Sequence, residues 1–113
     1  MASVDKSGMR VLVVGASKEP RAVQSLIDAG AEVHSIDKQR PIVSWLGSHT
    51  DCDIADAGAL RKAVDRVGSV LHALYIAADM LEQPRQAVID AARAKSIDGI
   101  FEVSRLDDSQ DGK

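Results

Sequence analysis

The segment from Arg10 to Arg21 holds the residues of this chain whose types and spacing best suit ligand binding. A run of apolar residues stops at Gly15, and Ala16 and Ser17 follow before helical spacing begins. Where a strand turns through glycine into a helix, backbone amides at the start of the helix are exposed and can hold the oxygens of a phosphate group. Gly15, Ala16 and Ser17 are therefore a candidate phosphate cradle, and the alternative is a tight turn that binds no ligand.

The charges beside this turn act in opposite directions. Lys18 and Arg21 can attract a phosphate, whereas Glu19 places negative charge where the phosphate would lie. Pro20 has no backbone N–H and so removes one donor. We therefore expect the turn to bind a phosphate weakly or not at all.

The apolar spacing predicts alternating strands and helices around this turn. Continuous apolar runs are typical of strands buried on both faces of a parallel sheet, and spacing of three and four residues indicates helices. We expect Ser17 to cap the first helix, Gly30 to end it and Asp56 to cap the second. The expected strands are 10–14, 31–37, a short strand ending within 51–54, 70–76 and 99–103; the expected helices are 18–29, one that follows Asp56, and 81–95.

This alternation implies a parallel sheet with right-handed crossovers. We predict an α/β, Rossmann-like three-layer fold with a five-stranded parallel sheet in the order 3-2-1-4-5. The chain has 113 residues, which is the size of one domain. We expect a flexible arm at 1–8, the folded domain at 9–106 and a disordered acidic tail at 107–113.

Composition excludes several classes of function. The net charge is −3, and no block of basic residues is present to follow the phosphates of a nucleic acid. No apolar run reaches the ~20 residues of a membrane helix, and the polar start of the chain predicts no leader. The single cysteine, Cys52, fits a reducing cytoplasm. Cys52 and His49 lack the further ligands of a zinc site, so we expect no metal.

Several segments taken together resemble the extended or atypical short-chain dehydrogenase/reductase family, in its NAD-dependent epimerase/dehydratase and NmrA-like branch. Residues 9–17 resemble that family's first strand and turn, and Asp53-Ile54-Ala55-Asp56 resembles its D-[LV]-T-D turn. Residues 88–94 resemble the helix before its fifth strand, and residues 100–104 resemble that strand and the serine after it. The resemblance covers 9–104 and implies the N-terminal, NAD(P)-binding half of such an enzyme.

The resemblance also assigns three contacts to a bound dinucleotide. Asp37, at the end of the second expected strand, matches the acid that bonds the ribose hydroxyls, and the alternative is an exposed loop aspartate. Asp53 and Ile54 match the residues that contact adenine, and the alternative for Asp53 is the cap of a turn. Together with Gly15 to Lys18 and Arg21, these residues form the candidate cofactor site.

The departures from the family pattern point away from its chemistry. The family loop reads G-x-x-G-x-x-G, whereas the segment from Gly15 to Arg21 is about two residues shorter and keeps only the first glycine. The family transfers a proton with a Tyr-x-x-x-Lys pair. The only tyrosine here is Tyr75, and the residue four positions later is Asp79. We therefore assign no catalytic residue and expect either no cofactor or weak NAD(P) binding.

The resemblance and the departures from it together leave three possible functions. The first is a binding, regulatory or protein-interaction module without oxidoreductase activity of its own. The second is a small NAD(P)-binding enzyme or subunit that oligomerisation completes. The third, a CoA-binding domain, rests on a weaker resemblance of Val14-Gly15-Ala16-Ser17, with Pro20 nearby, to the start of such domains.

The fourth expected strand suggests a surface for association. Apolar residues alternate on both of its faces, and full-length members of the resembled family cover both faces with helices. Here the face over strands four and five, on the side of the first helix, lacks such a cover. We expect a homo-oligomer or a protein partner on this face, because exposed apolar faces are unfavourable in water. Trp45 is either a local lid over the sheet or an interface anchor.

Overall fold

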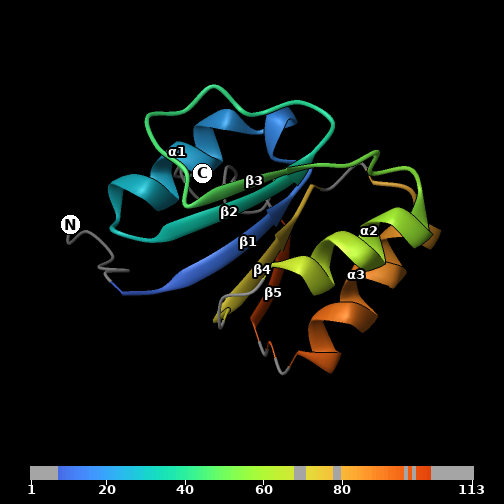
Figure 1. Cartoon of the computed structure of the whole chain (residues 1–113). Helices are drawn as coiled ribbons and strands as arrows, with labels where there is room; N and C mark the ends of the chain where they lie inside the picture. Colours follow the sequence, from blue (N-terminus) through green and yellow to red (C-terminus); the bar gives the residue numbers. More distant parts are fainter. Residues whose placement is uncertain (1–7, 68–70, 78–79, 96, 98, 103–113) are drawn as a thin grey trace, which may run out of the picture.

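A five-stranded parallel sheet forms the centre of the computed structural model, which describes residues 8–67, 71–77, 80–95, 97 and 99–102 (Figure 1). The strand order is β3-β2-β1-β4-β5, and every neighbouring pair is parallel. Both the order and the direction agree with the sequence prediction. The strands are β1 (Arg10–Val14), β2 (Glu32–Asp37), β3 (Ser48–Asp51), β4 (Ala73–Ile76) and β5 (Gly99–Glu102).

Helices cover both faces of the sheet and complete three layers. The helix α1 (Pro20–Asp28) lies on one face, and α2 (Ala57–Arg66) and α3 (Glu82–Ala94) pack together on the other (Figure 1). The connection 38–47 contains no helix or strand and passes on the α1 side (Figure 1). Right-handed crossovers produce this arrangement, because the chain moves from β1 to β3 in one direction and then returns to β4 and β5.

The side chains of β1 form two separate apolar cores, one on each face. Leu12 and Val14 belong to the core under α2 and α3, and Val11 and Val13 belong to the core under α1. All four are fully buried. This alternation explains why the sequence of β1 is apolar throughout, since a strand covered on both faces has no polar side.

The start of the first helix differs from the prediction. Residues Ala16–Lys18 form a short 3-10 helix, η1, and α1 begins only at Pro20. The N-cap of α1 is Glu19, without a side-chain hydrogen bond, so the predicted cap at Ser17 is wrong. Pro20 causes the interruption: its ring favours the first turn of a helix, where its missing N–H costs no hydrogen bond.

Three other predictions concern the third strand, the second helix and the fourth strand. The third strand ends at Asp51, within the predicted range of 51–54, and the following residues turn towards α2. The predicted cap at Asp56 is confirmed, because its side chain accepts a hydrogen bond from the backbone N–H of Ala59 at 3.0 Å. The fourth strand begins at Ala73, and the predicted start at Val70 lies outside the described residues.

The expected arm and tail fall almost wholly outside the described part of the chain, as does the predicted end of the fifth strand at Val103. Within the described ranges, no helix is long and apolar enough to cross a membrane.

Candidate functional site

The candidate site lies at the carboxyl end of the sheet, where β1 turns into η1. Gly15 has φ +84°, and its backbone N–H donates to the carbonyl of Ile36 at the end of β2. A Cβ at Gly15 would lie 2.6 Å from the Cβ of Ala77, which follows β4. Both the backbone angle and the close approach of Ala77 therefore require glycine at this position.

Asp37 closes the turn from the neighbouring strand. One carboxylate oxygen accepts hydrogen bonds from the backbone N–H of Ser17 at 3.0 Å and from its hydroxyl at 2.6 Å. The other carboxylate oxygen accepts from the backbone N–H of Lys38 at 2.6 Å. Asp37 is only 4% exposed, and its buried carboxylate accepts these three hydrogen bonds from within the chain. Ser17 therefore binds an acid of the chain itself rather than capping α1.

Three consecutive amides in this turn donate within the chain. The Ser17 amide donates to Asp37, the Lys18 amide to the carbonyl of Gly15 at 3.2 Å, and the Glu19 amide to the carbonyl of Ala16 at 3.0 Å. The next residue, Pro20, has no amide hydrogen. A phosphate at this turn would have to displace these bonds, and it would meet the negative charge of Asp37.

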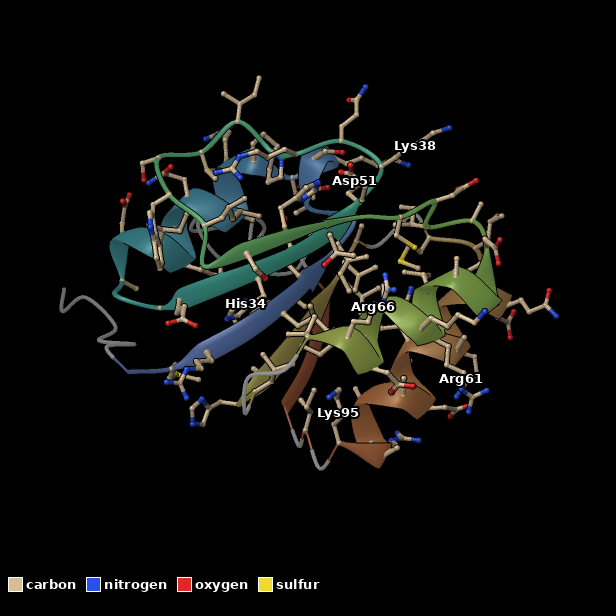
Figure 2. The ribbon with its side chains drawn as sticks, viewed as in Figure 1. His34, Lys38, Asp51, Arg61, Arg66 and Lys95 are labelled. Carbon is tan, nitrogen blue, oxygen red and sulfur yellow. The ribbon has the colours of Figure 1, made fainter. Side chains whose placement is uncertain are left out.

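The structure brings some of the predicted cofactor-binding residues together and leaves others apart. The side chain of Ile54 reaches the cradle, with its Cδ1 3.6 Å from the position of a Cβ on Gly15. Asp53 is exposed and accepts from the backbone N–H of Ala55 at 3.0 Å, as a turn cap does. Lys18 and Arg21 are exposed. Lys38, which follows Asp37, extends outward at the end of β2 (Figure 2).

Two features at this end of the sheet were not predicted. The first is Ala77, whose Cβ leaves no room for a side chain at Gly15. In the sequence, only the position of Ala77 directly after the fourth strand could have indicated this contact. The second feature is a chain of hydrogen bonds from Ser35 to His49 at 2.5 Å and from His49 to Asp51 at 2.9 Å. Ser35 is fully buried, so it has no access to a substrate, and the three side chains tie β3 to β2.

His34 and His72 each bond other groups of the chain through their rings. His34 bonds Ser48 and Glu32, both at 2.7 Å, and His72 accepts from the backbone N–H of Arg10 at 2.9 Å. Across the described ranges, no group of three potential ligands is placed to hold a metal ion.

Tyr75 is buried within β4 and is 5% exposed. Burial raises the pKa of its phenol above the usual range. A tyrosine that exchanges protons near neutral pH needs the opposite shift and access to a substrate. The position of the chain's only tyrosine therefore does not suit the proton transfer of the resembled family.

Cys52 lies just beyond β3 and is partly buried. Burial and the nearby carboxylates of Asp56 and Asp53 raise the pKa of its thiol, because both disfavour the thiolate.

We expect Asp56→Asn to increase the rate of Cys52 alkylation by iodoacetamide about two- to fivefold at pH 8. The substitution removes a negative charge, lowers the thiol pKa and increases the fraction of thiolate, while asparagine still caps α2. Asp53→Asn should give a smaller increase. Mass spectrometry of the alkylated chain measures the rates, and equal rates in all three proteins would contradict this electrostatic account.

No family model matches this sequence, and no curated protein matches it. Solved structures with the same fold do match. A C-terminal deletion mutant of aldohexose dehydrogenase from Thermoplasma acidophilum gives a TM-score of 0.67 at 21% identity, over 85% of this chain and 49% of that protein. A short-chain dehydrogenase from Leptospira borgpetersenii with bound NAD+ gives 0.63 at 16% identity, over 88% of this chain and 52% of that protein.

A short-chain dehydrogenase/reductase from Veillonella parvula in complex with NADP gives a TM-score of 0.63 at 13% identity, over 83% of this chain and 46% of that protein. The chain therefore spans about half the length of these structures. At these identities the likeness shows the fold alone: the chain has the Rossmann-like fold found in NAD(P)-binding short-chain dehydrogenases.

Proposed function

We propose that this chain is a Rossmann-like binding or regulatory module without oxidoreductase chemistry of its own. The observation that carries the proposal is the carboxylate of Asp37, which accepts from both the amide and the hydroxyl of Ser17 in the turn where a dinucleotide phosphate would lie. An acid in this position opposes a phosphate by charge and uses the donors that would hold it. The buried Tyr75 supports the same conclusion for the chemical step.

Such a module would act by binding a protein. The proposed binding surface is the β4–β5 face of the sheet, on the α1 side. Figure 1 shows α1 beside β2, away from β5. Ala73 and Tyr75, on this face of β4, are only 2% and 5% exposed, so the expectation that this face is uncovered is wrong for β4, and a partner would have to bind beyond it, at the β5 end of the sheet. A second copy of the chain fits this role, and light scattering on the purified chain would then give the mass of a dimer.

Weak NAD(P) binding is the second candidate, and the position of Asp37 favours it. The residue ends β2, where an acid of this fold can bond the ribose of a dinucleotide. The structures from Leptospira and Veillonella hold NAD+ and NADP on the same fold. In this case Asp37 would exchange Ser17 for ribose hydroxyls, and the chain would belong to the epimerase/dehydratase and NmrA-like branch. A CoA-binding role has less support, because it rests on the turn at Gly15 alone.

Isothermal titration of the intact chain with NADH, NADPH, CoA and ATP separates these functions. We expect none of the four to bind at this turn at millimolar concentration, because the donors at Ser17, Lys18 and Glu19 are already used. Saturable binding of NADH or NADPH would support a small NAD(P)-binding enzyme or subunit. Binding of CoA alone would support a CoA-binding domain. Either result would overturn the proposal of a closed cradle.

A further inference from the structure

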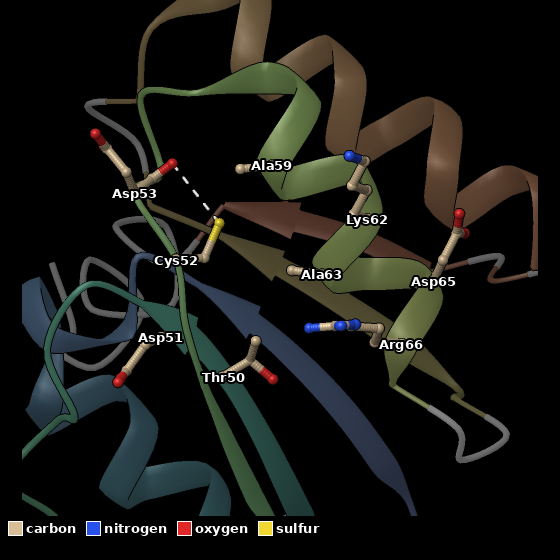
Figure 3. Close-up of a pocket in the computed structure, with 9 residues that line it drawn as sticks. All are labelled: Thr50, Asp51, Cys52, Asp53, Ala59, Lys62, Ala63, Asp65 and Arg66. Atoms are coloured by element: carbon tan, nitrogen blue, oxygen red, sulfur yellow. Dashed lines mark hydrogen bonds between the residues drawn. The ribbon is translucent and has the colours of Figure 1, made fainter.

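A groove with a volume of about 580 Å³ lies between β3 and α2, on the face of the sheet opposite α1 (Figure 3). Thr50 and Cys52 line it from the end of β3, and Lys62 and Arg66 line it from α2. It is separate from the turn at Gly15, none of whose residues lines it. The groove exists because β3 is the edge of the sheet and α2 packs farther inward, leaving one side of β3 uncovered.

Two cations stand one helical turn apart on the α2 wall. Residues four apart lie on the same side of a helix, so Lys62 and Arg66 can act on one ligand. Arg66 extends across the groove towards Thr50 (Figure 3). No ion pair or hydrogen bond of either side chain is found within the described part of the chain. Both cations are therefore available to an anion.

The wall and floor between these cations consist of small side chains. Ala59 and Ala63 come from α2, Thr50 comes from β3, and Cys52 directly follows that strand. Such a surface has little polar character and leaves room for a flat or compact organic body. The volume is within the range of about 300–1,000 Å³ that small-molecule sites occupy, so a bare inorganic ion would leave most of it to water.

Acidic side chains mark the two ends of the groove. Figure 3 shows Asp53 at one end and Asp65 at the other, while Asp51 points away from Arg66. Asp51 is also held by His49 on the opposite face of β3. Asp53 and Asp65 would repel a ligand that was anionic throughout. They suit a ligand whose body donates hydrogen bonds through hydroxyl or amino groups.

We propose that this groove binds a small organic anion: a phosphate or carboxylate group held by Arg66 and Lys62, on a body that carries hydroxyl or amino donors towards Asp53 and Asp65. The body lies against Ala59 and Ala63. A nucleoside monophosphate and a sugar acid both have this chemistry, and they differ in the anionic group and in the shape of the body.

Four probes test the proposal on the intact chain: AMP, gluconate, adenosine and inorganic phosphate. Amide chemical shifts in an NMR titration locate binding, and protection of Cys52 from iodoacetamide reports occupancy of the groove. We expect AMP or gluconate to bind saturably, with shifts in 50–53 and in α2 and slower alkylation of Cys52. Adenosine lacks the anion and phosphate lacks the body, so each should bind at least about tenfold more weakly.

Charge-removing variants provide the decisive comparison. Arg66→Gln should weaken binding of the better probe about tenfold or more, since it removes a charge-assisted hydrogen bond. Arg61→Gln removes the same charge from an exposed position on α2 that does not line the groove, and it should leave binding unchanged (Figure 2). Far-ultraviolet circular dichroism confirms that both variants remain folded.

Three results would overturn the proposal: no saturable binding of AMP or gluconate at millimolar concentration, equal weakening by the two substitutions, or shifts confined to 15–19. The last would place the ligand at the turn after β1 instead.

Discussion

Gly15→Ala should destabilise the chain by about 2–6 kcal/mol, a large part of the roughly 5–15 kcal/mol that holds a domain together. Two costs add at this position. At φ +84° an alanine is in the left-handed region, which costs roughly 1–3 kcal/mol. Its Cβ would also lie 2.6 Å from that of Ala77, and such overpacking costs a further roughly 1–3 kcal/mol. Urea denaturation followed by circular dichroism measures the free energy of unfolding.

A double-mutant cycle with Ala77→Gly separates these two costs. Removing the Ala77 methyl relieves the overlap but leaves the backbone strain, so the cycle should give a coupling energy of about 1 kcal/mol or more. The matched control is Gly58→Ala in α2, where the nearest atom is 3.6 Å away and φ is not positive. That substitution should be neutral or slightly stabilising, because alanine favours a helix. A wild-type midpoint for Gly15→Ala would refute this account.

The regular part of the fold could be read from the sequence because its signals are local. Helical spacing located α2 and α3 to within a residue or two, and Asp56 marked the start of α2 as an N-cap does. The strand order is that of a Rossmann-like fold, and right-handed crossovers then decide which face of the sheet each helix covers. These predictions needed no knowledge of which side chains meet across the sheet.

In the turn after β1, the prediction of a helix cap from local residue type was wrong. Ser17 has the right residue type for a helix cap, but its hydroxyl bonds Asp37, which is 20 residues away in the sequence. Pro20 moved the start of α1 and left Ser17 in η1. A propensity for capping describes a single helix and contains no information about a competing acid on the next strand.

The groove beside α2 could not be predicted for a related reason. Lys62 and Arg66 follow an ordinary helical pattern, in which charged residues mark the solvent side. Their proximity to Thr50 and Cys52 depends on how far α2 sits from the edge of the sheet, which is a tertiary quantity. The buried bond between Ser35 and His49 likewise depends on the register of β3 on β2.

Asp37→Ala should have the second large effect, because it leaves three donors without their acceptor. The backbone N–H groups of Ser17 and Lys38 and the Ser17 hydroxyl would all lose the carboxylate. We expect a loss of about 2–4 kcal/mol in the free energy of unfolding, given roughly 1.5–3 kcal/mol for a hydrogen bond to a charged group and partial replacement by water. Ser17→Ala removes only the hydroxyl and should cost about 1 kcal/mol.

The same substitution also tests whether the carboxylate blocks an anion. In Asp37→Ala the Ser17 amide is free and the opposing charge is gone, so inorganic phosphate or ATP should raise the midpoint of thermal unfolding in proportion to the logarithm of its concentration above Kd. The wild type should lack this additional stabilisation, because Asp37 keeps its turn closed. Asp90→Ala, an exposed acid on α3 that does not line the groove beside α2, controls for a general change in net charge. If Asp37→Ala is destabilised yet indifferent to phosphate and ATP, Asp37 only holds the turn in place; if it responds, the chain carries a phosphate cradle that its own acid keeps closed.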